Sequence, residues 1–250
     1  MCLILVAYKM HPTSNLIVLA NRDEFYERPT KNAEWWNESP NIFAGKDLKA
    51  GGTWLGVNEY GKFGALTNYR DPSKFNPQAA SRGSLITKYL KSERSIPNFI
   101  DQYVGNTSIY NDYSLFLYDG NNLGYFSSME EKLINLTPGI YGLSNALLDS
   151  NWPKVNRGKK ALEEFVKTDE LSYEKAFEIL SDKTPANDVD LPSTGVGLEK
   201  ERLLSPMHIS YPGYGTRSSN VLFFNTDDSI HFYERDHLTG NKIEEKFTIE

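Results

Sequence analysis

The only cysteine of this 250-residue chain is its second residue, and a polar cluster, Asn21-Arg22-Asp23-Glu24, follows two apolar runs. A cysteine thiol can act as a nucleophile. If Met1 is removed, as a small second residue normally permits, Cys2 also carries a free α-amine. The pKa of an α-amine, ~7.7–8.0, suits a general base. The sequence therefore predicts a nucleophile with its own base on the same residue.

Two apolar runs precede the cluster and predict the hairpin that positions it. They are CLILVAY at 2–8 and LIVLA at 16–20, and HPTSN between them is typical of a turn. The cluster then lies where the second strand ends.

The pairing of these strands would bring the cluster to Cys2. We expect Lys9 to pair with Leu16, which puts Cys2 opposite Asp23 and the next residue opposite Arg22. Opposed residues on antiparallel strands lie about 4.5–5.5 Å apart. The carboxylate could orient the amine, and the guanidinium could favour the thiolate or hold an anionic group of a substrate. Two alternatives stay open: an inert buried cysteine and a solvated turn.

Composition excludes several classes of protein. The aromatic content of 13% argues against disorder, and the net charge of −6 argues against a nucleic-acid-binding surface. No apolar stretch reaches the ~18–20 residues that span a bilayer. One cysteine allows no intramolecular disulfide, so we expect a cytoplasmic protein. The oligomeric state is left open.

Strand patterns at both ends and helical patterns in the middle predict an α+β fold and a single domain at 1–250. A loop-rich span is expected through Trp35 and Trp36, and a polar loop at 183–197. The other expected elements are hairpins at 53–68 and 113–128, helices within 84–104, 152–166 and 172–180, and strands at 140–145, 219–224, 229–235 and 242–249.

Several short motifs occur in order along the chain. They are Cys2, NRDE followed by Phe25 and Arg28-Pro29-Thr30, GGTWLGVN, GALTNYRDP, GLSN with Trp152-Pro153-Lys154 downstream, and YGTRSS. Together they resemble the NRDE family, also called the transport-and-Golgi-organisation family. That family is similar to the cysteine N-terminal-nucleophile hydrolases, such as bile salt hydrolases and penicillin V acylases. The resemblance implies a four-layer αββα sandwich and hydrolysis of a non-peptide C–N bond.

The resemblance also implies roles for individual residues. Cys2 matches the nucleophile and Asp23 the carboxylate near the amine. Asn68 in GALTNY matches the asparagine of the oxyanion hole, Asn145 in GLSN a second asparagine of the site, and Arg217 in YGTRSS a late arginine.

One position departs from the hydrolase pattern. Those enzymes carry an arginine three residues before the aspartate, where this chain has Ala20. Arg22 is the nearest substitute, but adjacent residues on a strand point to opposite faces. We therefore expect Arg22 to take less part in catalysis than Cys2 or Asp23.

Asn21, Trp54 and Tyr69 are the candidate substrate-binding residues, and Trp54 is favoured because it follows Gly51-Gly52 in the hairpin that ends at Asn68. We expect no metal and no cofactor, since the histidines form no ligand motif. These histidines are His11, His208, His231 and His237.

Two hypotheses follow for the function. The first is a cysteine N-terminal-nucleophile amidohydrolase or acyltransferase that acts on a small acylated molecule. The second is a non-catalytic carrier or chaperone on the same scaffold, which binds haem or a lipid-like metabolite, because members of the family it resembles have been linked to haem and lipid handling.

Overall fold

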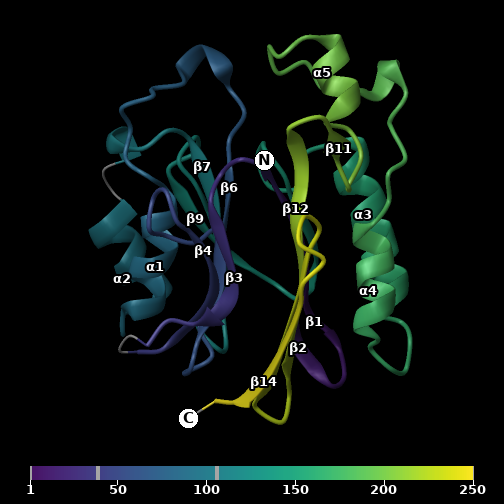
Figure 1. The fold of residues 1–250 in the computed structure, drawn as a ribbon. Coiled ribbons are helices and arrows are strands. Elements are labelled where there is room, and N and C mark those ends of the chain that lie inside the picture. The colour runs from purple at the N-terminus through teal and green to yellow at the C-terminus, as the bar shows by residue number, and fades with distance from the viewer. Residues whose placement is uncertain (1, 38–39, 105–106, 250) are drawn as a thin grey trace.

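Two antiparallel sheets lie face to face between two helical layers (Figure 1). The computed structural model describes residues 2–37, 40–104 and 107–249. The first sheet has the order β10 (Gly139–Leu143), β1 (Cys2–His11), β2 (Ser14–Phe25), β12 (Tyr214–Asn225), β13 (Ser229–Asp236) and β14 (Lys242–Thr248), with β11 (Ser210–Tyr211) paired to β12. The second has the order β3 (Thr30–Trp35), β4 (Ile42–Asp47), β5 (Leu55–Asn58), β6 (Phe63–Asn68), β7 (Tyr113–Tyr118), β8 (Leu123–Ser127) and β9 (Lys132–Leu136).

The helices cover the outer faces of the sheets (Figure 1). The second sheet is covered by α1 (Gly83–Lys91) and α2 (Ile96–Phe99), which continues into a π-helical turn at Ile100–Val104. The first is covered by α3 (Pro153–Phe165) and α4 (Tyr173–Leu180), with α5 (Leu198–Leu203) at one end. Short 3-10 turns occur at Pro72–Lys74, Thr107–Ile109 and Asp188–Asp190. No helix of the described residues is long and apolar enough to cross a membrane.

Three hydrophobic cores fill the three interfaces between the four layers. Ile4 and Phe63 belong to the core between the sheets. Leu66 packs with α1 and α2, whereas Leu5 and Leu19 pack with α3 and α4. Since β1 and β2 are covered on both faces, their apolar runs are continuous rather than alternating. This arrangement confirms the predicted α+β class and the four-layer αββα sandwich.

The first hairpin forms as predicted, but its register differs by one residue. Strand β1 holds two residues, Lys9 and Met10, where β2 holds only Asn15, and Lys9 has a φ of 52°. This bulge shifts the pairing, so Cys2 lies opposite Arg22 and not opposite Asp23.

The corrected register decides which side chains share a face. Successive residues of a strand point to opposite faces. Cys2 and Arg22 therefore point, like Ile4 and Ala20, toward the space between the sheets. Asp23 points, like Leu19, toward the layer of α3 and α4.

Most of the expected strands and helices are present. The strands that the sequence did not predict are short or contain polar residues. The span through Trp35 and Trp36 is not loop-rich, because it contains β3 and β4. Strand β9 was also missed. Both β3 and β9 are edge strands with half-exposed side chains, so their sequences lack the apolar runs of the central strands.

A close contact between two glycines joins the second sheet to α1. A Cβ on Gly52 would lie 2.5 Å from the carbonyl carbon of Gly83 and 2.7 Å from its oxygen. Gly83 is the first residue of α1, so the contact fixes the start of that helix beside the segment that carries Trp54.

Substitution Gly52→Ala should therefore destabilise the fold by about 1–3 kcal/mol, because the backbone of Gly83 must move. Urea denaturation followed by circular dichroism measures the free energy of unfolding. The control is Gly64→Ala, whose Cβ would meet only side-chain atoms, at 3.3 Å or more. Equal losses in the two variants would contradict the role given to this contact.

Candidate active site

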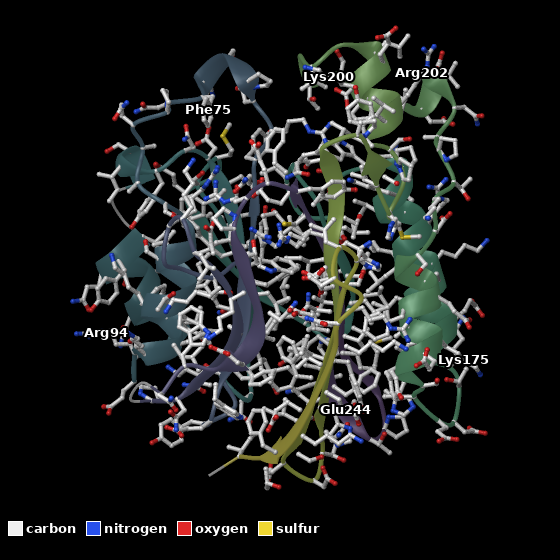
Figure 2. The ribbon with its side chains drawn as sticks, in the orientation of Figure 1. Phe75, Arg94, Lys175, Lys200, Arg202 and Glu244 are labelled. Atoms are coloured by element: carbon white, nitrogen blue, oxygen red, sulfur yellow. The ribbon has the colours of Figure 1, made fainter. Side chains whose placement is uncertain are left out.

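A cavity of about 590 Å³ lies at the end of the molecule where β1 begins. Figure 1 marks the N-terminus there, and Figure 2 shows Phe75, which borders the cavity, at the same end as Lys200 and Arg202 of α5. Among the predicted site residues, those that line the cavity are Cys2, Arg22, Asp23, Trp54, Asn68 and Arg217.

Cys2 is the first residue of β1 and only 8% exposed. Its carbonyl oxygen accepts a hydrogen bond from Ser144 Oγ at 3.1 Å, which fixes the backbone of Cys2 from the residue that follows β10. Burial raises the pKa of the Cys2 thiol, while the charge of Arg22 and the backbone N–H of Asp23 act to lower it. The thiol is therefore neutral near pH 7.

Asp23 is 1% exposed and lies on the other face of β2, although it borders the cavity. Its Oδ1 accepts a hydrogen bond from Thr216 Oγ1 at 2.7 Å, and this hydroxyl accepts one from the Ile209 N–H at 2.9 Å. Burial raises the pKa of Asp23, and the positive charge of Lys154 is the strongest influence in the opposite direction. The carboxylate is thus fixed by β12 and influenced by α3.

Arg22 shares a face with Cys2. Its Nη1 donates to Thr30 Oγ1 at 3.1 Å, and its Nη2 lies 3.7 Å from Glu24 Oε2. The guanidinium is 93% buried at the cavity wall and remains close enough to the thiol to act on its charge. This geometry corrects the expected register, which put Asp23 and not Arg22 opposite Cys2.

Arg217 stabilises the turn that follows β2. Its Nη1 donates to the carbonyl oxygens of Tyr26 at 2.9 Å and Arg28 at 2.7 Å. It lies at an irregularity of β12, between Thr216 and Ser218. Its contacts with described residues are those of a side chain that shapes the cavity wall.

Asn68 and Asn145 are joined by a hydrogen bond, but only Asn68 lines the cavity. Asn68 ends β6 and lines the cavity, and its side-chain amide makes no hydrogen bond to any described residue. Asn145 is 1% exposed, does not line the cavity, and donates from Nδ2 to the Asn68 carbonyl oxygen at 2.8 Å. The geometry leaves the Asn68 amide available to a ligand and makes Asn145 its support.

Two predicted substrate-binding residues lie away from the cavity. Asn21 is fully buried toward the helical layer, and its Nδ2 donates to the carbonyl oxygens of Leu180 and Met207, both at 2.9 Å. Tyr69 does not line the cavity, and its backbone N–H donates to the Asp112 carbonyl oxygen at 2.9 Å. Of the three candidates, only Trp54 borders the cavity.

The cavity also contains polar residues that the sequence analysis missed. Arg82 precedes α1, interacts electrostatically with Cys2, and donates from Nη1 to the Asp112 carbonyl oxygen at 3.0 Å. Glu234 also lines the cavity and accepts hydrogen bonds from Asn32 Nδ2 and the Ala33 N–H, both at 3.0 Å. No motif marks these positions, because the second sheet and β13 bring them in from distant parts of the chain.

The chain is similar to known proteins along nearly its whole length. The family model described as Transport and Golgi organisation 2 matches residues 1–239. The chain belongs to the Transport and Golgi organisation 2 family. Its mouse homolog is 34% identical over 259 residues, covering 95% of this chain and 94% of the relative. The human homolog is 34% identical over 256 residues, covering 94% and 92%, and the Drosophila melanogaster protein is 29% identical over 272 residues, covering 96% and 93%.

Two solved structures have a fold similar to that of this family member. A C2A mutant of the conjugated bile acid hydrolase from Clostridium perfringens has a TM-score of 0.58 at 10% identity, covering all of this chain and 97% of the other. The Caenorhabditis elegans N-acylethanolamine-hydrolyzing acid amidase ortholog has a TM-score of 0.52 at 11% identity, covering 89% and 92%. This chain therefore has the N-terminal-nucleophile hydrolase fold.

The departure from the hydrolase pattern also has a structural context in this family member. Ala20 is fully buried in the core between the sheets, opposite Ile4. An arginine at this position would have to displace core side chains. Arg22, one pair nearer the strand end and on the same face, is the arginine that neighbours Cys2.

Substitution Asn145→Ala should cost about 0.5–1.5 kcal/mol, because the partly buried carbonyl oxygen of Asn68 loses the amide that donates to it. The measurement is the free energy of unfolding in urea. Asn135→Ala, at an exposed position of β9 in the sheet that contains Asn68, is the control. An Asn145 variant as stable as the control would contradict the supporting role.

The Cys2 thiol should react slowly with iodoacetamide at pH 7, because only the thiolate reacts and burial raises the pKa above its ordinary value of 9.0. The thiolate fraction grows as pH rises toward that pKa, so the rate should still increase above pH 9. Intact mass spectrometry measures the rate on the single cysteine, with the urea-unfolded chain as reference. A rate that levels off below about pH 8 would show a lowered pKa and contradict this prediction.

Proposed function

We propose that the chain is a cysteine N-terminal-nucleophile amidohydrolase or acyltransferase that acts on a small acylated molecule. The observation that carries the proposal is that Cys2, the first residue of β1, borders a cavity of about 590 Å³ together with Asp23 and Asn68. The volume lies within the ~300–1,000 Å³ of small-molecule pockets. Removal of Met1, which lies outside the described residues, is part of the proposal.

The proposed reaction has two acyl transfers. The neutral α-amine of Cys2 takes the thiol proton as the sulfur attacks the acyl carbonyl carbon, and Asn68 Nδ2 donates to the oxyanion that forms. The carbon–nitrogen bond then breaks, and the ammonium returns the proton to the leaving amine. Water, or an acceptor molecule, repeats the attack on the thioester and regenerates the thiol.

The charges of the cavity support a polar substrate. Arg22, Arg82 and Glu234 line the cavity, and both arginines interact electrostatically with Cys2. Trp54 and Phe75 add apolar surface to the same wall. A ligand with an acyl group and at least one polar group fits this lining.

The names of the fold neighbours support the same class of reaction. One is called a conjugated bile acid hydrolase and another an N-acylethanolamine-hydrolyzing acid amidase. We also infer that residues 1–250 act as one cytoplasmic domain, since the cavity takes side chains from β1 at the start of the chain and from β13 near its end.

A carrier on the same scaffold is the second candidate, and one observation favours it. The arginine of the hydrolase pattern is absent, because Ala20 occupies its position in the core. A carrier would bind haem or a lipid-like metabolite in the cavity without turnover.

Turnover depends on Cys2 and Asn68 if the first proposal holds. Intact mass should show loss of Met1, and p-nitrophenyl acetate should give a burst of nitrophenolate with one acyl group retained per chain. Cys2→Ala should abolish the burst. Asn68→Ala should slow it ~10²–10³-fold, because it removes an oxyanion donor. Asn135→Ala, on an exposed edge strand, is the control.

The opposite results separate the two candidates. A processed, folded wild-type protein that forms no acyl-enzyme with acyl esters, thioesters or anilides would contradict the enzyme. Stoichiometric binding of haemin or a fatty acyl ligand that persists in Cys2→Ala would then support the carrier.

A further inference from the structure

A buried lysine lies behind the proposed nucleophile. Lys154, the second residue of α3, is 1% exposed, and it is the only lysine among the buried described residues. Its Nζ donates to the Leu204 carbonyl oxygen at 3.1 Å. Removing an ammonium group from water costs several kcal/mol unless other charges compensate, so its surroundings need an explanation.

Opposite and like charges surround Lys154. Arg70, just after β6, forms a buried ion pair with Glu201 of α5, at 2.8 Å between Nη1 and Oε2. The same guanidinium stacks on Trp152, 4.8 Å from the ring centre. Glu201 also accepts a hydrogen bond from Thr194 Oγ1 at 2.6 Å. These contacts hold the loop after β6 and α5 against the first turn of α3.

Asp23, on β2 of the first sheet, interacts electrostatically with Lys154 and Arg70. Its side chain points to the α3 side of β2, and Lys154 is the strongest influence that opposes the effect of burial on its pKa. Burial in turn lowers the pKa of Lys154 to about 8, with Asp23 the strongest opposing influence. Each charge therefore favours the ionised form of the other.

Asp23, Arg70, Lys154 and Glu201 form what we call the buried charge cluster. It contains two acids and two bases, so it is neutral when all four side chains are ionised. The α-amine of Cys2 would lie at the edge of this cluster. A proton on that amine would then add an unbalanced charge to a buried site, which is unfavourable. Without Lys154 the cluster would be negative and would favour the protonated amine.

We propose that Lys154 is a positioning residue that keeps the Asp23 carboxylate ionised and the α-amine of Cys2 in its proton-accepting form. The inference rests on the proposed function, since it assigns a task to the processed Cys2. Lys154 does not touch the reacting atoms, and its positive charge acts on both the Asp23 carboxylate and the amine.

Other charged or titratable groups near Cys2 lie on the cavity side and on β12. On the cavity side Arg22 pairs with Glu24, and Arg82 lines the same cavity. On β12 the hydroxyl of Tyr214 stays neutral, because burial raises its pKa. The pH dependence of the amine therefore reflects the buried charge cluster.

One cysteine in the chain permits a direct measurement. In protein labelled with ¹³C-cysteine, the Cα chemical shift of Cys2 reports titration of the amine and of Asp23 as a coupled pair, and needs no substrate. Lys154→Met should raise the midpoint by about one pH unit or more, because a positive charge is lost. Lys154→Arg should restore it, and Lys160→Met, at an exposed position of the same helix, should leave it unchanged.

Glu201→Gln provides a test of opposite sign. It removes a negative charge from the cluster, so the midpoint should fall, and it applies even if Lys154→Met does not fold. The acid limb of the nitrophenolate burst should move with each midpoint. A purely structural lysine would lower stability without moving either quantity.

The outcomes distinguish this inference from the proposed function. Midpoints that stay the same in folded Lys154→Met and Glu201→Gln would overturn the role of Lys154 and leave Cys2 catalysis intact. A shifted midpoint in a protein that never forms an acyl-enzyme would support the charge coupling and contradict the enzyme. Retention of Met1, shown by intact mass, would remove the amine and overturn both.

Discussion

The pairing of β1 with β2 is the constraint on which the rest of the site depends. The bulge at Lys9 and Met10 sets that pairing, and it puts the Cys2 thiol on the cavity side and the Asp23 carboxylate on the helix side. The backbone at Cys2 lies between these two faces. The proposed nucleophile and the group proposed to control its base can thus lie on different faces of the sheet and still act on one residue.

This division explains why the two sides of the first sheet differ in chemistry. The cavity side offers groups that a ligand can reach, including Arg82 and the side-chain amide of Asn68. The helix side holds acidic and basic side chains that solvent does not reach, and Arg70 and Glu201 among them form an ion pair. The residues proposed to recognise a ligand and those proposed to control protonation are therefore different, and a substitution can change one set without the other.

Sequence patterns predicted the central strands, the helices and, through the family resemblance, the four layers, because buried elements have continuous or periodic apolar residues. Edge strands such as β3 and β9 lack that signal. The register could not be predicted, because a single-residue bulge does not change the pattern of apolar residues. A shift of the pairing by one residue nevertheless changes which side chains of the two strands share a face. For the same reason Arg22 and Asp23 exchanged their expected orientations. The sequence showed Lys154 only as part of a motif. Its proposed role could not be predicted, because it depends on Arg70 and Glu201, which are distant in the sequence.

Cys2 is held in the sheet from both sides, by β2 and by the contact from Ser144, and it borders the cavity. Any peptide attached before Cys2 would therefore have to leave from the cavity wall and would compete with a ligand for that space. The C-terminus lies at the opposite end of the molecule (Figure 1). Purification tags and fusion partners therefore belong at that end, where they leave the cavity open to a ligand.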